Sequence, residues 1–187
     1  MKSALERFLA LFLLIVLLPI LIILGIVTFT DSSGPVIFRQ RRVGYKGKHF
    51  TVYKFRTMYD KPWSVVNISG NDKRVTSSGR FLRRTHFDEL PQFWNIVRGQ
   101  MSFVGPRPQV PELVDLYDSL YPLRYRRRLM LLPGLTGLPQ IMGEKLGAHN
   151  LFKAIALDEL YRQKKNIWLD IKIFLLTIVK VLKASSY

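Results

Sequence analysis

The stretch Thr85-His86-Phe87-Asp88-Glu89-Leu90-Pro91-Gln92 places two adjacent carboxylates at the predicted start of a helix. Pro91 suits a first helical turn, where its missing N–H would have no partner, and the helix is predicted to end near Gly99. Cationic side chains flank the pair at Arg80, Arg83, Arg84 and Arg107. An exposed carboxylate among guanidinium groups suits a phosphate substrate, because arginine neutralises phosphate oxygens while the carboxylate attacks phosphorus or holds a metal ion.

A structural interpretation of this stretch is also open. Thr85 followed by Asp88 is an ordinary capping-box pattern, and acidic residues in a first turn complement the helix dipole. Such a pair alone is more often structural than catalytic. Its meaning therefore depends on the rest of the chain.

The composition limits the possible functions. A chain of 187 residues can build one domain with a core, and the absence of cysteine excludes disulfides, thiolate metal sites and thiol nucleophiles. The formal net charge of +16 implies an anionic partner. High apolar content beside this charge favours a membrane surface over nucleic acid, and we find no recognition-helix or stacking-sheet motif for nucleic acid.

Residues 8–29 form an apolar run without a charged residue. As a helix it would reach about 33 Å, enough for the hydrocarbon core of a bilayer. Pro19 interrupts the run and predicts a kink, so a spanning helix and a re-entrant hairpin are both open. The basic residues of segment 39–48 mark the cytoplasmic side.

The remainder of the chain predicts an α/β fold that is mostly helical. Strands are predicted at residues 36–38 and 50–56, a basic loop at 39–48, a polar loop at 61–78, a turn-rich loop at 133–140, and helices at 109–120, 152–165 and 167–183. The last helix is interrupted by charges and is expected to lie in the membrane interface with its lysines snorkelling. The arginine-rich segment 124–132 favours a solvated or headgroup-facing surface over substrate binding.

Five ordered motifs then identify a family. They are Tyr53-Lys54-Phe55-Arg56-Thr57-Met58, Arg74-Val75-Thr76 with Gly79-Arg80-Phe81-Leu82-Arg83, Asp88-Glu89-Leu90-Pro91-Gln92, Gly105-Pro106-Arg107-Pro108 and Pro133-Gly134-Leu135-Thr136-Gly137. This series resembles the monotopic phosphoglycosyl transferases of the bacterial sugar transferase family, over residues 8–183. The length resembles the small, PglC-like subgroup.

The resemblance implies a reaction at the inner face of a bacterial cytoplasmic membrane. A UDP-sugar donates its sugar-1-phosphate to undecaprenyl phosphate, giving a polyprenol diphosphosugar and UMP, with Mg²⁺ required. An N-acetylated sugar is expected in preference to glucose or galactose. Membrane lipids are the further expected partners, and the resemblance leaves the oligomeric state open.

The resemblance also assigns roles to residues. Asp88 would be the nucleophile that carries a covalent phosphosugar intermediate and, with Glu89, a metal ligand. Glu89 would hold the metal or assist deprotonation of the lipid phosphate. The implied substrate-binding residues are Lys54, Arg56, Arg80, Arg83, Arg107, Thr136 and Gln140.

The resemblance favours the re-entrant geometry for the first segment. Residues 1–30 would form a helix broken at Pro19, and residues 31–187 a cytosol-facing catalytic domain with a C-terminal interfacial helix. Leu18 stands where the family commonly has serine, and Pro139 where many members have tryptophan. The rival hypothesis is a catalytically idle protein that binds polyprenol phosphate or recruits other enzymes.

Overall fold

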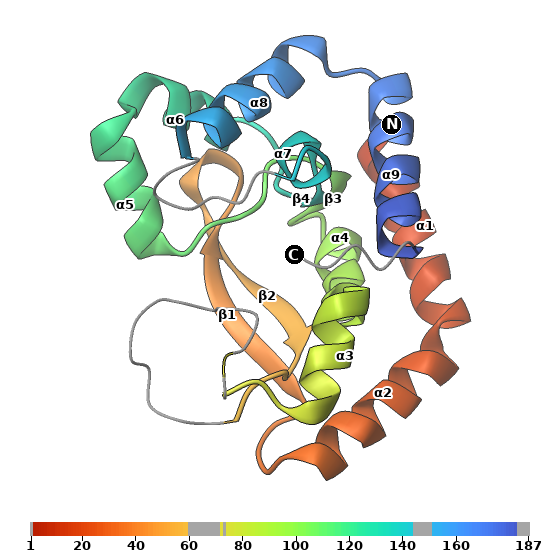
Figure 1. Ribbon diagram of the computed structural model, residues 1–187. Helices are drawn as coiled ribbons and strands as arrows, with labels where there is room; N and C mark the ends of the chain where they lie inside the picture. The colour runs from red at the N-terminus through yellow and green to blue at the C-terminus, as the bar shows by residue number, and fades with distance from the viewer. Residues whose placement is uncertain (1, 60–71, 73, 144–150, 183–187) are drawn as a thin grey trace.

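The computed structural model describes residues 2–59, 72, 74–143 and 151–182 (Figure 1). In chain order the elements are α1 (Lys2–Val16), α2 (Leu18–Asp31), β1 (Ile37–Val43), the 3-10 turn η1 (Tyr45–Gly47), β2 (His49–Phe55), α3 (Ser77–Thr85), the 3-10 helix η2 (Phe87–Gln92), α4 (Phe93–Val97), β3 (Ser102–Val104), α5 (Pro111–Leu120), α6 (Pro122–Leu129), β4 (Gly134–Thr136), α7 (Leu138–Ile141), α8 (Leu151–Lys164) and α9 (Ile167–Leu182). The predicted class, α/β and mostly helical, is confirmed.

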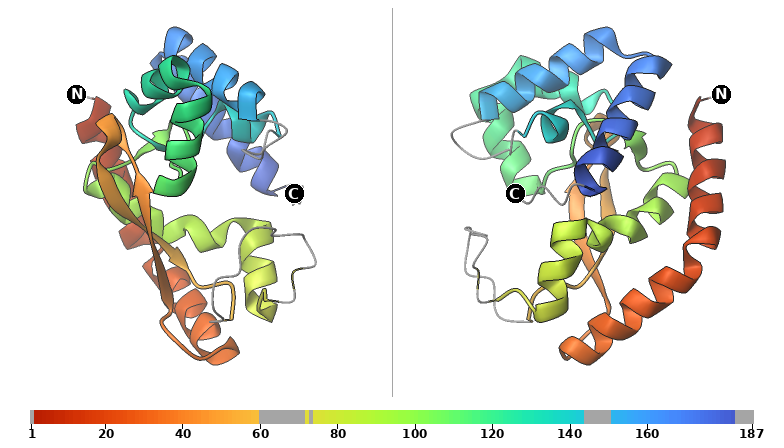
Figure 2. Two further views of the ribbon diagram at one scale, coloured as in Figure 1. Left: turned by 90° about the vertical axis from the view of Figure 1, so that its left-hand side faces the viewer. Right: turned by 45° about the vertical axis from the view of Figure 1, so that its right-hand side comes forward.

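The predicted break in the apolar N-terminal run is present. Helices α1 and α2 meet at Leu17 with a bend of 63°, and Pro19 lies in the first turn of α2. Proline there has no N–H to continue the ladder of the preceding helix, which accounts for the change of direction. Within the described residues no single helix is long and apolar enough to cross a bilayer, and this bent pair is the one candidate by length and composition. It follows the right-hand edge of the molecule in Figure 1 and in the right-hand view of Figure 2.

The hairpin of β1 and β2 corrects the prediction of a basic loop at residues 39–48. The two strands pair antiparallel from Ile37 opposite Phe55 to Val43 opposite His49. Arg39 and Arg41 are exposed, whereas the side chains between and after them are partly covered. This alternation is the period of two expected of a strand. The alternation could not be recognised in the sequence, because most of the residues concerned are charged or polar.

The main core joins the N-terminal helix to the rest of the chain. Ala10 of α1 is fully buried with Val52 of β2, Ile96 of α4, Phe103 of β3 and Ile173 of α9. Two polar contacts near the start of α1 support this packing. The Ser102 hydroxyl donates to a Glu6 carboxylate oxygen at 2.7 Å, and the Arg7 guanidinium lies against Gly99.

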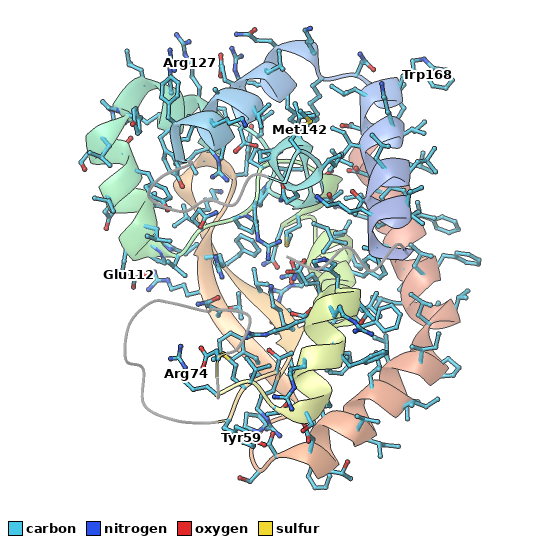
Figure 3. The ribbon with its side chains drawn as sticks, viewed as in Figure 1. Tyr59, Arg74, Glu112, Arg127, Met142 and Trp168 are labelled. Carbon is cyan, nitrogen blue, oxygen red and sulfur yellow. The ribbon has the colours of Figure 1, made fainter. Side chains whose placement is uncertain are left out.

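The predicted helix at residues 167–183 is present as α9, and two of its charged residues, Asp170 and Lys180, make contacts inside the protein. Asp170 is buried and accepts a 2.6 Å hydrogen bond from the Tyr161 hydroxyl. Lys180 donates to the backbone carbonyls of Gln140 and Ile141, at the end of α7. The exposed side of α9 is mostly apolar but includes Lys172, and Trp168 projects outward from the first turn (Figure 3). The interfacial position of this helix therefore stays a prediction.

Arg56 fixes the end of α2 to the hairpin. Its guanidinium donates to the carbonyl oxygens of Thr28, Ser32 and Pro35 and to the Ser32 hydroxyl, and the side chain is buried. Carbonyls at a helix C-terminus have no partner within the helix, so a cation placed there satisfies them and complements the helix dipole. Arg56 therefore acts within the fold at this junction.

We expect Arg56→Ala to lower the free energy of unfolding by about 2 to 4 kcal/mol, because several buried carbonyls lose a charged donor. Chemical denaturation of the detergent-solubilised protein measures this. Arg41→Ala, which removes an exposed arginine from the same hairpin, is the matched control and should change stability by less than about 0.5 kcal/mol. Equal effects of the two substitutions would contradict the assigned role of Arg56.

Candidate active site

The paired carboxylates lie on η2, which begins directly after α3. Thr76 caps the start of α3 by accepting from the Gly79 N–H, and His86 ends that helix with a φ of 58° in the left-handed region. The Thr85 hydroxyl donates back to the carbonyls of Phe81 and Leu82. Thr85 therefore belongs to the last turn of α3, and the capping-box interpretation is wrong.

Asp88 and Glu89 are both buried, each with 9% of its surface exposed, which corrects the expectation of an exposed carboxylate at a helix end. The 3-10 turn and the chain reversal at His86 place them against β2, beside Lys54. Burying two adjacent carboxylates is costly unless cations compensate. The two residues meet this condition in different ways.

Glu89 is paired with two cations, mainly through one of its oxygens. Its Oε1 atom accepts from the Lys54 ammonium at 2.5 Å and from Arg107 Nη2 at 2.6 Å, and its Oε2 atom accepts from Arg107 Nη1 at 3.4 Å. Burial alone would raise the pKa of Glu89, but the charges and hydrogen bonds of Arg107 and Lys54 outweigh it and hold that pKa well below its ordinary value. Glu89 is therefore a permanent anion at neutral pH.

Asp88 is not paired in this way. Its carboxylate makes no hydrogen bond or ion pair with another residue in the part of the chain that the structure describes. Burial raises the pKa of Asp88 to about 6, with the Glu89 charge acting in the same direction and Lys54, Arg107 and Arg83 opposing it. Asp88 is thus ionised at neutral pH while its oxygens remain available to a ligand.

Arg83 and Lys54 complete the cationic surroundings of Asp88. Arg83 lies on α3, and its Nε donates to the Thr57 hydroxyl at 2.8 Å. Burial lowers the pKa of Arg83 and that of Lys54 despite the neighbouring carboxylates. Guanidinium and ammonium groups beside an unpaired carboxylate can neutralise a phosphate that approaches it.

The segment that precedes Arg107 packs closely against the segment that contains Gly134. Gly105 donates to the Thr136 carbonyl at 2.9 Å, and Gly134 donates to the Pro106 carbonyl at 2.9 Å. A Cβ atom on Gly105 or Gly134 would collide with the backbone of the other segment. The close approach of the two motifs therefore requires glycine at both positions.

The other residues implied by the resemblance lie outside the Glu89 cluster. Arg56 holds the end of α2, and exposed Arg80 makes a 3.4 Å contact with the Ser77 hydroxyl. The Thr136 hydroxyl lies 2.7 Å from that of Thr177 on α9. Gln140 lies on α7, where its backbone carbonyl accepts from Lys180. The structure thus gathers Lys54, Arg83 and Arg107 around the two carboxylates, and gives the remaining four other contacts.

Two arginines that the sequence reasoning did not select are part of the surroundings. Arg42 donates to the Pro108 carbonyl at 3.0 Å, and burial lowers its pKa to about 10. Arg128 donates to the Arg107 carbonyl at 2.5 Å and is 4% exposed. Arg124, Arg126 and Arg127 are exposed, as a surface segment predicts, whereas the burial of Arg128 departs from that prediction. The spacing from Tyr125 to Arg128, one helical turn, was the available signal for a buried face.

The carboxylates of the site fit Mg²⁺ only if phosphate oxygens of a bound substrate complete the coordination of the ion. Among the described residues there is no group of three or more acidic, histidine or cysteine side chains that could hold a metal ion. Mg²⁺ commonly takes one or two carboxylates, substrate phosphate oxygens and water. Asp88 can supply an unpaired carboxylate, and Glu89 Oε2 has only the long contact to Arg107. Asp88 and Glu89 therefore fit the role of ligands to a phosphate-bound ion.

Asp88→Asn should stabilise the protein above pH 6. Because the pKa of Asp88 rises from 3.8 to about 6 on folding, wild-type stability falls as pH rises across this interval, by at most about 3 kcal/mol. The amide does not titrate, so the stability advantage of the variant should grow between pH 4 and pH 6 and then remain constant. Chemical denaturation at several pH values in the presence of a chelator measures it.

Glu159→Gln is a control for which the expected change in stability has the opposite sign. The Arg162 hydrogen bond lowers the pKa of Glu159, so that carboxylate contributes stability above its ordinary pKa, and the glutamine variant should lose stability there. A stability difference for Asp88→Asn that is independent of pH would contradict the raised pKa.

Comparisons with known proteins show the family of the chain. A model of the bacterial sugar transferase family matches residues 1–184. The chain is 45% identical over 175 residues to the UDP-glucose:undecaprenyl-phosphate glucose-1-phosphate transferase of Klebsiella pneumoniae, covering 89% of this chain and 37% of that protein. It is 38% identical over 164 residues to the galactosyl transferase CpsE of Streptococcus agalactiae, covering 81% of this chain and 35% of that protein. It is 41% identical over 150 residues to the uncharacterized sugar transferase EpsL of Bacillus subtilis, covering 80% and 71%.

The chain thus spans well under half the length of the Klebsiella and Streptococcus relatives. The match to the family model nevertheless extends over nearly the whole chain, from the bent N-terminal helices to α9. This chain belongs to the bacterial sugar transferase family.

Proposed function

We propose that this protein is a phosphoglycosyl transferase that moves a sugar-1-phosphate from a UDP-sugar to undecaprenyl phosphate. The observation that carries the proposal is the contrast between two buried neighbours. Glu89 is held by Lys54 and Arg107, whereas Asp88 is ionised, unpaired among the described residues and surrounded by cations. The names of the Klebsiella relative and of other similar proteins support the two substrates.

UDP-glucose is the donor to test first. The expectation of an N-acetylated sugar has no support, because the names of the Klebsiella and Streptococcus relatives specify glucose and a galactosyl group. The described residues around Asp88 that bear charge recognise phosphate rather than a particular sugar. The proposal of UDP-glucose as donor therefore rests on the names of the relatives and not on the site.

The proposed chemistry takes place in two displacements. An Asp88 carboxylate oxygen attacks the phosphorus attached to the sugar, the bond to the bridging oxygen breaks, and UMP leaves with that electron pair. An oxygen of the lipid phosphate then attacks the same phosphorus and expels the Asp88 carboxylate. A pKa of about 6 leaves most of Asp88 ionised at neutral pH, so it needs no base to become a nucleophile.

Arg107, Lys54 and Arg83 would offset the repulsion between the anionic nucleophile and the phosphates of the donor. Glu89 is suited to orienting two of these cations. Its pKa lies well below the ordinary value, which makes it a weak proton acceptor. We therefore favour positioning and metal ligation by Glu89 over deprotonation of the lipid phosphate. Mg²⁺, when bound by Asp88, Glu89 and substrate oxygens, would supply additional positive charge.

The apolar surface supports a membrane-bound, re-entrant arrangement at the cytoplasmic face. Large apolar side chains are exposed along α1, α2 and α9, among them Phe8, Phe12, Ile23 and Phe29. Apolar surface on this scale marks a contact with lipid or with another protein. The bend at Leu17 and the basic strand β1 that follows α2 favour lipid with both helix ends on one side.

UMP release tests the reaction. With UDP-glucose, Mg²⁺ and undecaprenyl phosphate, we expect steady release of UMP, and without the lipid a burst no larger than the amount of enzyme. Asp88→Asn should abolish both while retaining the fold. Asp115→Asn, an exposed carboxylate on α5, should retain normal turnover. Substantial turnover by Asp88→Asn would exclude it as the nucleophile, and no release from a panel of UDP-sugars would favour the idle binder.

Cysteine labelling tests the re-entrant arrangement. Because the chain has no cysteine, Lys2→Cys and Ser33→Cys each introduce a single thiol, one at the first residue of α1 and one just after α2. In oriented vesicles, an impermeant maleimide should label both only from the cytoplasmic side. Labelling from opposite sides would mean that α1 and α2 together cross the bilayer.

A further inference from the structure

Arg128 and Asp158 form a buried ion pair away from the paired carboxylates. The Arg128 Nε atom donates to Asp158 Oδ2 at 2.6 Å, and the two side chains are 4% and 1% exposed. Arg128 lies on α6 and Asp158 on α8. Neither residue belongs to the motifs identified in the sequence. A buried pair of this kind contributes little net stability, because desolvation of both ions offsets their attraction.

The remaining donors of Arg128 connect the ion pair to the segment that contains Arg107. Its Nη2 atom donates to the Arg107 carbonyl at 2.5 Å, and its Nη1 atom lies 3.4 Å from the Tyr125 hydroxyl. One planar guanidinium thus links α8, α6 and the backbone of the residue that binds Glu89. A guanidinium is suited to this because its donors are fixed in one plane.

Arg107 needs such support because its own side chain is 39% exposed. It lies between Pro106 and Pro108, which have no N–H to anchor the segment. The contacts come instead through carbonyls: Pro106 accepts from the Gly134 N–H, Pro108 accepts from Arg42, and Arg107 accepts from Arg128 and, at 3.3 Å, from the side-chain amide of Gln109. The Arg128 contact is the shorter of the two at Arg107 and the only one of them from a charged donor.

We propose that Arg128, held by Asp158, is a positioning residue that sets the placement of the Arg107 guanidinium through its backbone carbonyl. Arg128 touches neither carboxylate of the site directly, so its effect must pass through Arg107. The kinetic consequence rests on the proposed function, whereas the structural consequence does not.

Arg128→Lys is the primary variant, because lysine keeps the charge beside Asp158 but lacks the planar fork that bridges to the carbonyl. With UDP-glucose as donor, we expect kcat/KM to fall about 10- to 100-fold, the range for a displaced binding group. In an Arg107→Ala background the same substitution should change kcat/KM by less than about twofold, since no guanidinium remains to be placed.

Arg126→Lys is the matched control. Arg126 lies on the same helix but pairs with Asp118 at the surface, and its side chain is 71% exposed. Its neighbour Arg127 likewise projects from the outer edge of the molecule (Figure 3). The control should alter neither kcat/KM nor the melting temperature. Asp158→Asn, which keeps an oxygen to accept from Arg128, should repeat the effect of Arg128→Lys in a weaker form.

Hydrogen exchange measured by mass spectrometry decides the structural part independently of activity. In Arg128→Lys, the peptide covering residues 103–110 should exchange at least about fivefold faster, because the Gly105 amide loses its fixed register with β4. Arg126→Lys should leave this peptide unchanged. Unchanged exchange in Arg128→Lys, or losses that add fully in the Arg107→Ala background, would overturn the proposal. A wild-type protein that releases no UMP would reject the proposed function and leave the exchange comparison to decide.

Discussion

The Glu89 carboxylate joins the three parts of the chain that make the site. Lys54 comes from β2, Glu89 from η2 and Arg107 from the segment after β3, and their side chains meet within 2.6 Å of one oxygen atom. Glu89 could not be buried without these cations, because a desolvated charge without a partner is strongly disfavoured. The ion pairs therefore exist only where the three segments are assembled, and they fix the positions of the two cations.

This arrangement also explains why two adjacent carboxylates differ so much. Glu89 takes the nearest donors of Lys54 and Arg107, which leaves Asp88 with charge nearby but no hydrogen bond among the described residues. Burial then dominates at Asp88 and raises its pKa, while the cations dominate at Glu89 and lower it. Neighbouring acids whose environments separate their pKa values are a common way for one site to perform two tasks. Here one acid organises the cations and the other is left reactive.

Much of the fold could be predicted from the sequence. The break at Pro19, the strand at residues 50–56 and the long C-terminal helices follow from local signals that do not need tertiary context. The strand predicted at residues 36–38 marks only the start of β1. Its continuation to Val43 was predicted as a loop because the alternating positions hold arginines, which differ in exposure but not in charge. The resemblance named Lys54, Arg83 and Arg107, but no spacing in the sequence could show that Glu89 alone receives the close contacts.

Arg56 and Arg128 show why the functional residues could not be separated from the structural ones by motif alone. Arg56 lies inside a family motif two residues from Lys54, yet its guanidinium donates to backbone carbonyls at and just after the end of α2. Arg128 lies outside every motif among exposed arginines, yet it is bonded to the backbone of Arg107. The difference lies in which acceptors each side chain reaches, and these come from residues more than twenty positions away in both cases. An arginine's role in this protein is thus decided by the carbonyl groups around it, which the fold supplies.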